Sequence, residues 1–224
     1  MRETQRAFLG EDLEHQQERS ESRNAVSNRL VDLIDILFGV VVAVNFAVLL
    51  GNSPFNSVPA IEQIITLPNL SILVAYVAII LSWLGYHQMI ENNPYVLLNP
   101  WGYARFSIDV VIVFMYTVLM YSINITPLYL GSFAIVFLFY AIGGMVRNKE
   151  YDMEVSWPRG SLKYAALFVA VTAIWLLWEL VAVQYFRIDI IPKVLISAIL
   201  VFVALALNLL YRYERAKKGF KRKN

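Results

Sequence analysis

The sequence contains no cysteine and only two histidines among its 224 residues. Without cysteine, the chain can form no disulfide, no thiolate nucleophile and no Cys-ligated metal or iron–sulfur site. Two histidines, of which His15 lies in a polar N-terminal segment, are too few for the paired axial ligands of a membrane haem. Neither HExxH nor GxSxG is present, and no glycine-rich phosphate loop is present either. We therefore expect no enzymatic activity and no cofactor.

Charged residues are also scarce. They make up 16% of the chain, compared with roughly 25% in soluble domains, whereas 58% of the residues are hydrophobic and the mean hydropathy is +0.56. Apolar runs of roughly 20 residues, the length needed to cross a ~30 Å hydrocarbon core, recur along the sequence. Runs this continuous indicate helices. We expect an all-α integral membrane protein with six transmembrane helices, at about 30–50, 70–90, 106–125, 128–146, 162–186 and 194–211.

The basic residues predict the orientation of these helices. If both chain ends are cytoplasmic, 17 of the 19 lysines and arginines lie on the cytoplasmic side, and Arg187 and Lys193 lie opposite, as the positive-inside rule requires. The chain then divides into a cytoplasmic tail (1–26), a membrane domain (27–211) and a basic cytoplasmic tail (212–224). The polar first segment does not have the pattern of a cleavable signal peptide. We expect a multi-pass protein of the cell (inner) membrane, in contact with membrane lipids and not with nucleic acid.

Ionisable side chains within membrane spans are costly, so each is a functional candidate. We expect Asp35, in the first span, to pair with Arg29 or Arg105 and so to lock helices together, which is compatible with a functional role as well. Arg105 and Asp109 are four residues apart and can meet on one helix face. His87 lies at a similar depth, either as an interfacial hydrogen-bonded residue or as part of the same network. The sequence therefore predicts a helix-coupling polar network of Arg29, Asp35, His87, Arg105 and Asp109.

Two further polar residues lie inside the spans and leave alternatives open. Asn45 in the first span either hydrogen-bonds between helices or lines a pore, and the interhelical role is favoured. Glu179 in the fifth span is either a protonated carboxyl bonded to a neighbour or part of a polar cavity.

The first span has two distinct faces at 100° per residue. Asp32, Asp35, Gly39 and Ala43 share one narrow sector, and Arg29, Val40, Val44 and Ala47 share a neighbouring one. We expect the first sector, polar and rich in small residues, to be a packing face. The second sector is a smooth aliphatic face.

The first span also resembles a known family. Arg29 and Asp35 match the ends of the RxxxFSD signature that opens the transmembrane-protein-175 family of potassium-permeable channels, with Leu33 and Ile34 in place of Phe-Ser. Trp83 and His87 resemble the end of that family's second helix. The resemblance covers the first span and parts of the next two.

The resemblance implies an oligomeric (tetrameric) channel for potassium or other monovalent cations, with the first helices lining a central pore. Its hydrophobic constriction falls at Val40, with Val44 and Ala47 on the following turns. Such a constriction gates by excluding water. Two alternatives remain: a non-conducting membrane effector, sensor or scaffold, and a small proton-coupled transporter using Glu179 and Asp35. Transporters usually show inverted repeats and broken helices, and neither is clear in this chain.

Overall fold

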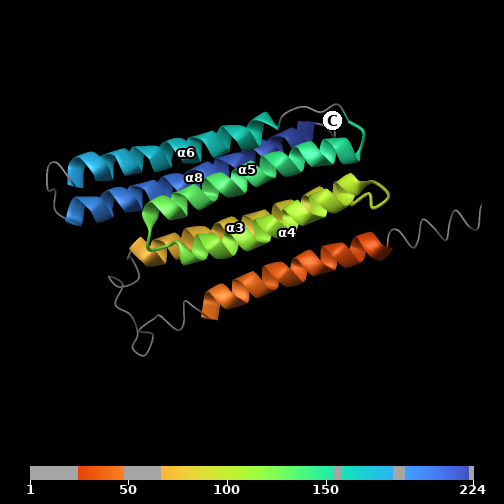
Figure 1. Cartoon of the computed structure of the whole chain (residues 1–224), viewed down its shortest axis with the longest axis horizontal. Coiled ribbons are helices and arrows are strands. Elements are labelled where there is room, and N and C mark those ends of the chain that lie inside the picture. The colour runs from red at the N-terminus through yellow and green to blue at the C-terminus, as the bar shows by residue number, and fades with distance from the viewer. Residues whose placement is uncertain (1–24, 48–66, 154–157, 184–189, 222–224) are drawn as a thin grey trace, which may run out of the picture.

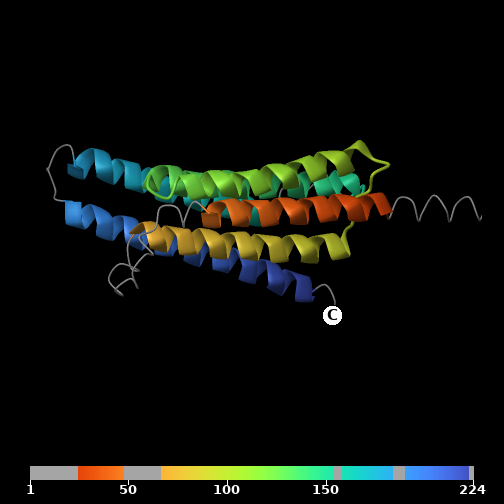
Figure 2. The same cartoon turned by 90° about the horizontal axis from the view of Figure 1, so that it is seen from below.

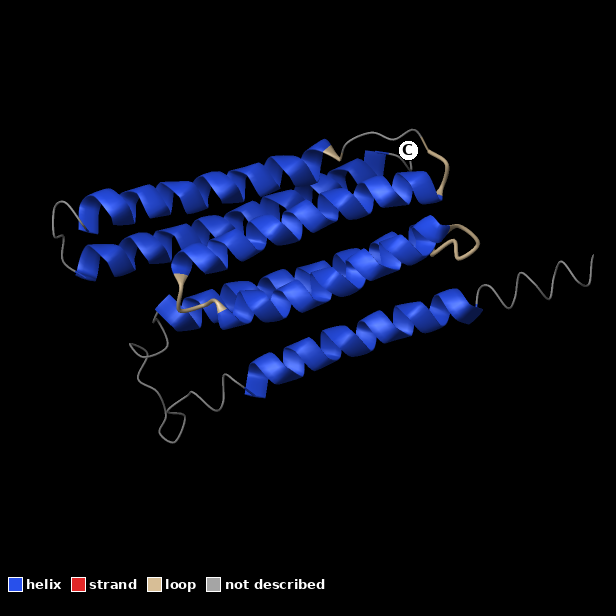
Figure 3. Ribbon diagram, viewed as in Figure 1, coloured by secondary structure: helices blue, strands red, loops and turns tan. Residues whose placement is uncertain are grey.

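The structure, a computed structural model, describes residues 25–47, 67–153, 158–183 and 190–221. Within these ranges it contains helices and connecting turns and no strand (Figure 3). Six of the described helices are long and apolar enough to span a membrane, which is the make-up of a multi-pass integral membrane protein. Their bounds are Ala25–Ala47 (the first helix), Leu67–Asn92 (α3), Pro100–Tyr121 (α4), Thr126–Glu150 (α5), Arg159–Trp178 (α6, continued by the π-helical turn η1, Glu179–Val183) and Ile190–Lys221 (α8).

Local sequence signals explain where several of these helices begin. The Asn99 side chain accepts a hydrogen bond from the Trp101 backbone N–H at 3.1 Å, which caps α4, and Pro100 occupies its first turn. Pro127 lies in the first turn of α5, at the break that the Thr126-Pro127 step predicts. Proline is tolerated there because the first-turn N–H groups have no partner within the helix.

Five of the helices form a closed ring. Contacts run from α3 to α8, from α8 to α6, then to α5, to α4 and back to α3, and α5 also contacts α8 across the ring. All the helices run roughly along one direction, with chain neighbours antiparallel (Figure 1). The weakest seam of the ring lies between α3 and α4.

The first helix covers this seam. In two perpendicular views it lies alongside α3 and α4 (Figures 1 and 2). The Phe38 ring is buried there, with its centroid 6.4 Å from that of Tyr86 on α3 and 6.5 Å from that of Tyr116 on α4. One aromatic side chain thus joins the first helix to both sides of the seam.

Aromatic stacking and buried hydrogen bonds hold the opposite side of the ring together. Phe137 of α5 stacks on Phe168 of α6 with ring centroids 5.3 Å apart. The Ser197 hydroxyl of α8 accepts hydrogen bonds from the Trp175 indole of α6 at 3.1 Å and from the Thr126 hydroxyl of α5 at 3.3 Å. Interhelical hydrogen bonds of this kind replace the hydrophobic driving force that lipid does not supply.

The two described ends of the chain lie at the same end of the bundle (Figure 1). The first helix begins there and α8 ends there. We call it the basic end, because the turns there hold Arg29, Arg105, Arg147, Arg159 and Arg212. The other two basic residues named above fall outside what the structure describes: Arg187 is not described, and nothing is described of the Lys193 side chain.

Candidate functional site

A carboxylate near the basic end fastens the first helix to α3. The Asp35 Oδ1 atom lies 2.9 Å from His87 Nε2 and accepts a hydrogen bond from Trp83 Nε1 at 3.0 Å. Trp83 and His87 are one turn apart, so they face the same side of α3, and their rings meet edge to face at 4.8 Å. Of the predicted network, the structure therefore brings Asp35 and His87 together, whereas Arg29 is exposed.

The packed face of the first helix differs from the expected one. The residues buried against the ring are Ile34, Phe38, Val41 and Asn45. Of the predicted packing sector, Asp35 bonds to α3, whereas Asp32, Gly39 and Ala43 are exposed, and no atom would contact a Cβ built at Gly39 within 4 Å. The expectation therefore held for Asp35 and was wrong for the other three residues, because the seam between α3 and α4 is filled by the large side chains of Ile34 and Phe38.

The aliphatic face points away from the ring. Val40 is 51% exposed and Val44 is 41% exposed, and Ala47 is exposed as well. All three lie on the side of the helix opposite Phe38. Asn45 is 2% exposed and belongs to the packed face, so in this structure it does not share the outward face with Val40.

The buried ion pair of Arg105 involves a carboxylate that the sequence analysis did not select. Its Nη1 atom donates to Glu150 Oε2 at 2.8 Å, with the two side chains 1% and 0% exposed. Glu150 Oε1 accepts from the Val96 backbone N–H at 2.7 Å, and Arg105 Nη2 donates to the Asn93 carbonyl at 2.8 Å. This group ties the turn between α3 and α4 to the end of α5. Arg105 was expected to pair with Asp109 on the same helix face, but its main contact is with Glu150 instead.

Asp109 instead anchors the same turn through a tyrosine. Its Oδ2 atom accepts a hydrogen bond from the Tyr95 hydroxyl at 2.8 Å. Burial and, next, the charge of Asp109 raise the pKa of Tyr95 well above its ordinary value, so the phenol stays protonated and keeps donating. The Arg105 guanidinium lies 4.9 Å from the centroid of the Tyr95 ring, within cation–π range.

A cavity of about 740 Å³ lies inside the bundle toward the basic end. All six membrane-length helices contribute to its wall, with Ile34 and Phe38 coming from the first helix. Its volume is that of a small-molecule site. The polar and charged side chains of the wall are Ser82, Tyr86, Arg105, Asp109, Tyr140, Arg147, Arg159, Ser161, Tyr211, Arg212 and Glu214.

Glu150 and Arg212 were missed at the sequence level because both were assigned to polar segments outside the six expected spans. α5 continues to Glu150, and α8 continues to Lys221. Arg212 therefore lies nine residues inside the end of its helix, a depth of about 14 Å at ~1.5 Å per residue. The sequence signal that could have pointed to Arg212 is Asn208, a polar residue in the apolar part of α8 that lies one turn earlier on the same helix face. Glu179 is partly buried where α6 becomes the turn η1, at the end of the bundle opposite the basic end.

No family model, curated protein or solved structure matches this chain. Among the described residues there is also no cluster of three or more histidine, aspartate or glutamate side chains that could hold a metal ion. The site is therefore interpreted from its own geometry: an anchored helix with an outward aliphatic face, and a cavity with arginines in its wall.

Proposed function

We propose that the chain is one subunit of a homotetrameric cation channel, permeable to potassium, whose pore is lined by the outward face of the first helix. The observation that supports this most is the division of that helix into two sides. Phe38 and Asp35 fasten one side to the ring, and the opposite side, with Val40 and Val44, contacts nothing within the protomer that would cover it.

A single helix cannot enclose a pore, so the proposal requires copies of the chain around a common axis. Val40 would form the constriction and Val44 and Ala47 would continue it. A ring of valines excludes water when narrow and conducts when it widens or becomes wet. Valine is smaller than the isoleucine or leucine that the resemblance to the transmembrane-protein-175 family implies here, so weak selectivity among monovalent cations is expected.

The charge of the interior cavity favours a pore outside the protomer. Four arginines and two carboxylates line the cavity, so its formal charge is +2, which repels cations. A cation path along the outward face of the first helix avoids this region. With the basic end on the cytoplasmic side, as the positive-inside rule predicts, the constriction would lie about two to three turns above the cytoplasmic mouth.

The test is potassium and sodium flux into proteoliposomes that contain the purified, oligomeric chain. Val40→Asn should raise potassium flux severalfold, because an amide at the constriction favours water. Val169→Asn is the matched control, since Val169 on α6 is 57% exposed and lies on a different helix. It should leave flux unchanged.

Two outcomes would count against the proposal. Absence of flux from protein shown to be folded and oligomeric would refute conduction altogether, and so would a strictly monomeric state in lipid. Equal flux from Val40→Asn and the parent chain would remove Val40 from the pore.

A second candidate function is that of a non-conducting membrane effector or sensor that binds a ligand inside the bundle. The cavity favours it, because all six membrane-length helices contribute to one wall and a ligand there would touch every span. Ligand binding without ion flux would favour this function over the channel.

A further inference from the structure

Arg212 of α8 borders the cavity without a counter-charge of its own. Its Nη2 atom donates to the Tyr140 hydroxyl at 3.1 Å, and its guanidinium lies 5.4 Å from the Tyr140 ring centroid and 5.5 Å from that of Tyr211. In the part of the chain that the structure describes, no carboxylate forms an ion pair with it. Its Nε atom is buried and has no hydrogen-bond partner there either.

The lack of a counter-charge distinguishes Arg212 from Arg105, although the buried Nε atom of Arg105 also has no hydrogen-bond partner. Both arginines line the same cavity, yet Arg105 is neutralised by Glu150 at 2.8 Å. A guanidinium held between helices without an anion has lost hydration that no counter-charge replaces. An anion in the cavity would offset that loss and would give the unpartnered Nε–H an acceptor.

The surrounding wall supplies further donors and an excess of positive charge. Arg147, from α5, and the hydroxyls of Ser82 and Ser161 share the lining with Arg212. The two serine hydroxyls also form hydrogen bonds with the hydroxyls of Tyr140 and Tyr211, respectively. The two carboxylates of the wall have donors of their own: Asp109 accepts from a tyrosine at 2.8 Å, and Glu214 pairs with a lysine at 3.1 Å. Guanidinium and hydroxyl donors around excess positive charge are the groups that recognise phosphate-type oxyanions.

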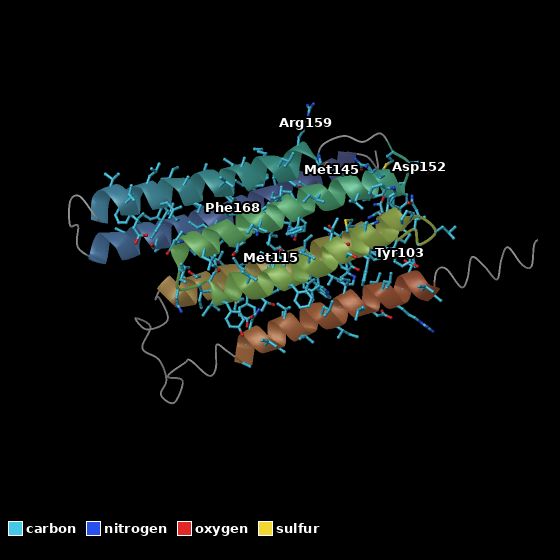
Figure 4. The ribbon with its side chains drawn as sticks, in the orientation of Figure 1. Tyr103, Met115, Met145, Asp152, Arg159 and Phe168 are labelled. Atoms are coloured by element: carbon cyan, nitrogen blue, oxygen red, sulfur yellow. The ribbon has the colours of Figure 1, made fainter. Side chains whose placement is uncertain are left out.

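Glycines make the space that this arrangement needs. A Cβ at Gly85 of α3 would lie 2.3 Å from Arg212 Nη1, so a larger residue there would require the guanidinium to shift. Gly143, Gly144 and Gly160 also line the cavity, and a Cβ at Gly160 would meet no atom within 4 Å. Arg159, at the rim, is exposed, and Figure 4 shows its side chain pointing away from the helices.

We propose that the cavity binds a phosphate-type oxyanion, with Arg212 as the main ligand and Arg147, Ser82 and Ser161 as further donors. The ligand enters from the basic end. Its source is either a soluble phosphate compound or the phosphate of an anionic lipid headgroup, since both present the same oxygens to the guanidinium. This site does not depend on the channel proposed above, because Val40 and the cavity lie on opposite sides of the first helix.

The experiment measures binding to the purified full chain in a zwitterionic detergent. One arm titrates inorganic pyrophosphate by calorimetry, with sodium chloride of matched ionic strength as the blank. A second arm measures binding to vesicles that contain phosphatidic acid in phosphatidylcholine, compared with phosphatidylcholine alone. Saturable binding of pyrophosphate assigns a soluble ligand, and selective binding of phosphatidic acid assigns a headgroup.

Arg212→Gln should weaken binding in the positive arm at least tenfold. Lys149→Gln is the matched control: Lys149 is exposed, lies on the same end of the bundle and does not line the cavity. The affinity of the Lys149→Gln variant for the probe should stay within twofold of that of the parent chain. Arg212→Lys keeps the charge but loses the planar guanidinium, so its affinity should lie between those of Arg212→Gln and Lys149→Gln.

A chemical measurement on the unmodified chain covers the case in which Arg212 variants fail to fold. Phenylglyoxal modifies accessible arginines, and peptide mass mapping reports each one. The bound probe should protect Arg212 severalfold and leave Arg29, on the outward face of the first helix, unprotected. The proposal is overturned if neither probe binds saturably, if Arg212→Gln binds like the parent chain, or if the probe protects Arg29 and Arg212 equally.

Discussion

Replacing Glu150 with alanine removes the counter-charge of a fully buried guanidinium, and the structure allows the cost to be worked out. The variant breaks the 2.8 Å pair with Arg105 and also leaves the Val96 backbone N–H without its 2.7 Å acceptor. Breaking a buried pair by removing one partner costs about 3–5 kcal/mol. Arg105 keeps its bond to the Asn93 carbonyl and borders the cavity, where water can hydrate it, so the lower value of about 3 kcal/mol applies.

At about 2–4 °C per kcal/mol for a chain of this size, Glu150→Ala should lower the melting temperature by roughly 6–12 °C. The assay is thermal unfolding of the detergent-purified chain, followed by the fluorescence of its five tryptophans. Lys163→Gln is the control, because the pair of Lys163 with Glu214 is 3.1 Å long but exposed. Exposed pairs contribute about 0–1 kcal/mol, so this variant should shift the melting temperature by less than about 4 °C.

A double variant separates the buried charge from the loss of packing. Arg105→Met combined with Glu150→Leu leaves no charge in the site and fills a similar volume, so it should recover more than half of the loss seen in Glu150→Ala. The reasoning is refuted if Glu150→Ala melts within 2 °C of the parent chain. It is refuted equally if the double variant is as unstable as the single one, since the buried charge then carries none of the cost.

Two further predictions use the same melting assay. Phe38→Ala empties the seam that the first helix covers and should cost about 3–5 kcal/mol; a shift like that of an exposed residue would mean that this helix does not pack there. Gly102→Ala should destabilise by about 1–3 kcal/mol, because its Cβ would lie 2.4 Å from the Val96 carbonyl oxygen. Gly39→Ala is its matched control: the site is open, so the substitution should be neutral or stabilising by up to about 1 kcal/mol. Equal losses at the two glycines would contradict both assignments.

The positions of the spans could be predicted because length and hydropathy are local properties. Their ends could not be predicted as well. α5 continues to Glu150, past the apolar run that was expected to end near 146, because helical hydrogen bonding continues into polar sequence. Arg147 and Lys149 in its last turn also favour the helix C-terminus. The membrane boundary and the helix boundary are different quantities, and only the first is read from hydropathy.

The pairing of charges required information that spacing alone does not contain. Arg105 and Asp109 are one turn apart and were expected to meet, but the carboxylate that holds Arg105 lies 45 residues further along the chain. Asp35 and His87 were expected at similar depths, and there the depth argument succeeded. Depth follows from the position within a span, whereas partners depend on which helices are neighbours.

The packing face of the first helix was mispredicted for a physical reason particular to membranes. In water, polarity separates the buried face from the exposed face, but lipid is as apolar as a protein core. Side-chain size does not identify the packed face either, since Ile36 and Phe46 of the same helix are exposed. Phe38 and Ile34 fill the seam and are buried, while the small residues Gly39 and Ala43 remain outside.

The first helix therefore separates two different electrostatic environments. Its packed side, through Ile34 and Phe38, forms part of a cavity whose lining carries a formal charge of +2. Its outward side carries Val40, Val44 and Ala47 and no charge along those turns. Anions are attracted to the first environment, and cations meet no repulsion from fixed charge at the second. The two proposals, an anion in the interior and cation passage along the exterior, therefore concern different faces of one helix, and the Arg212 and Val40 variants test the two sides separately.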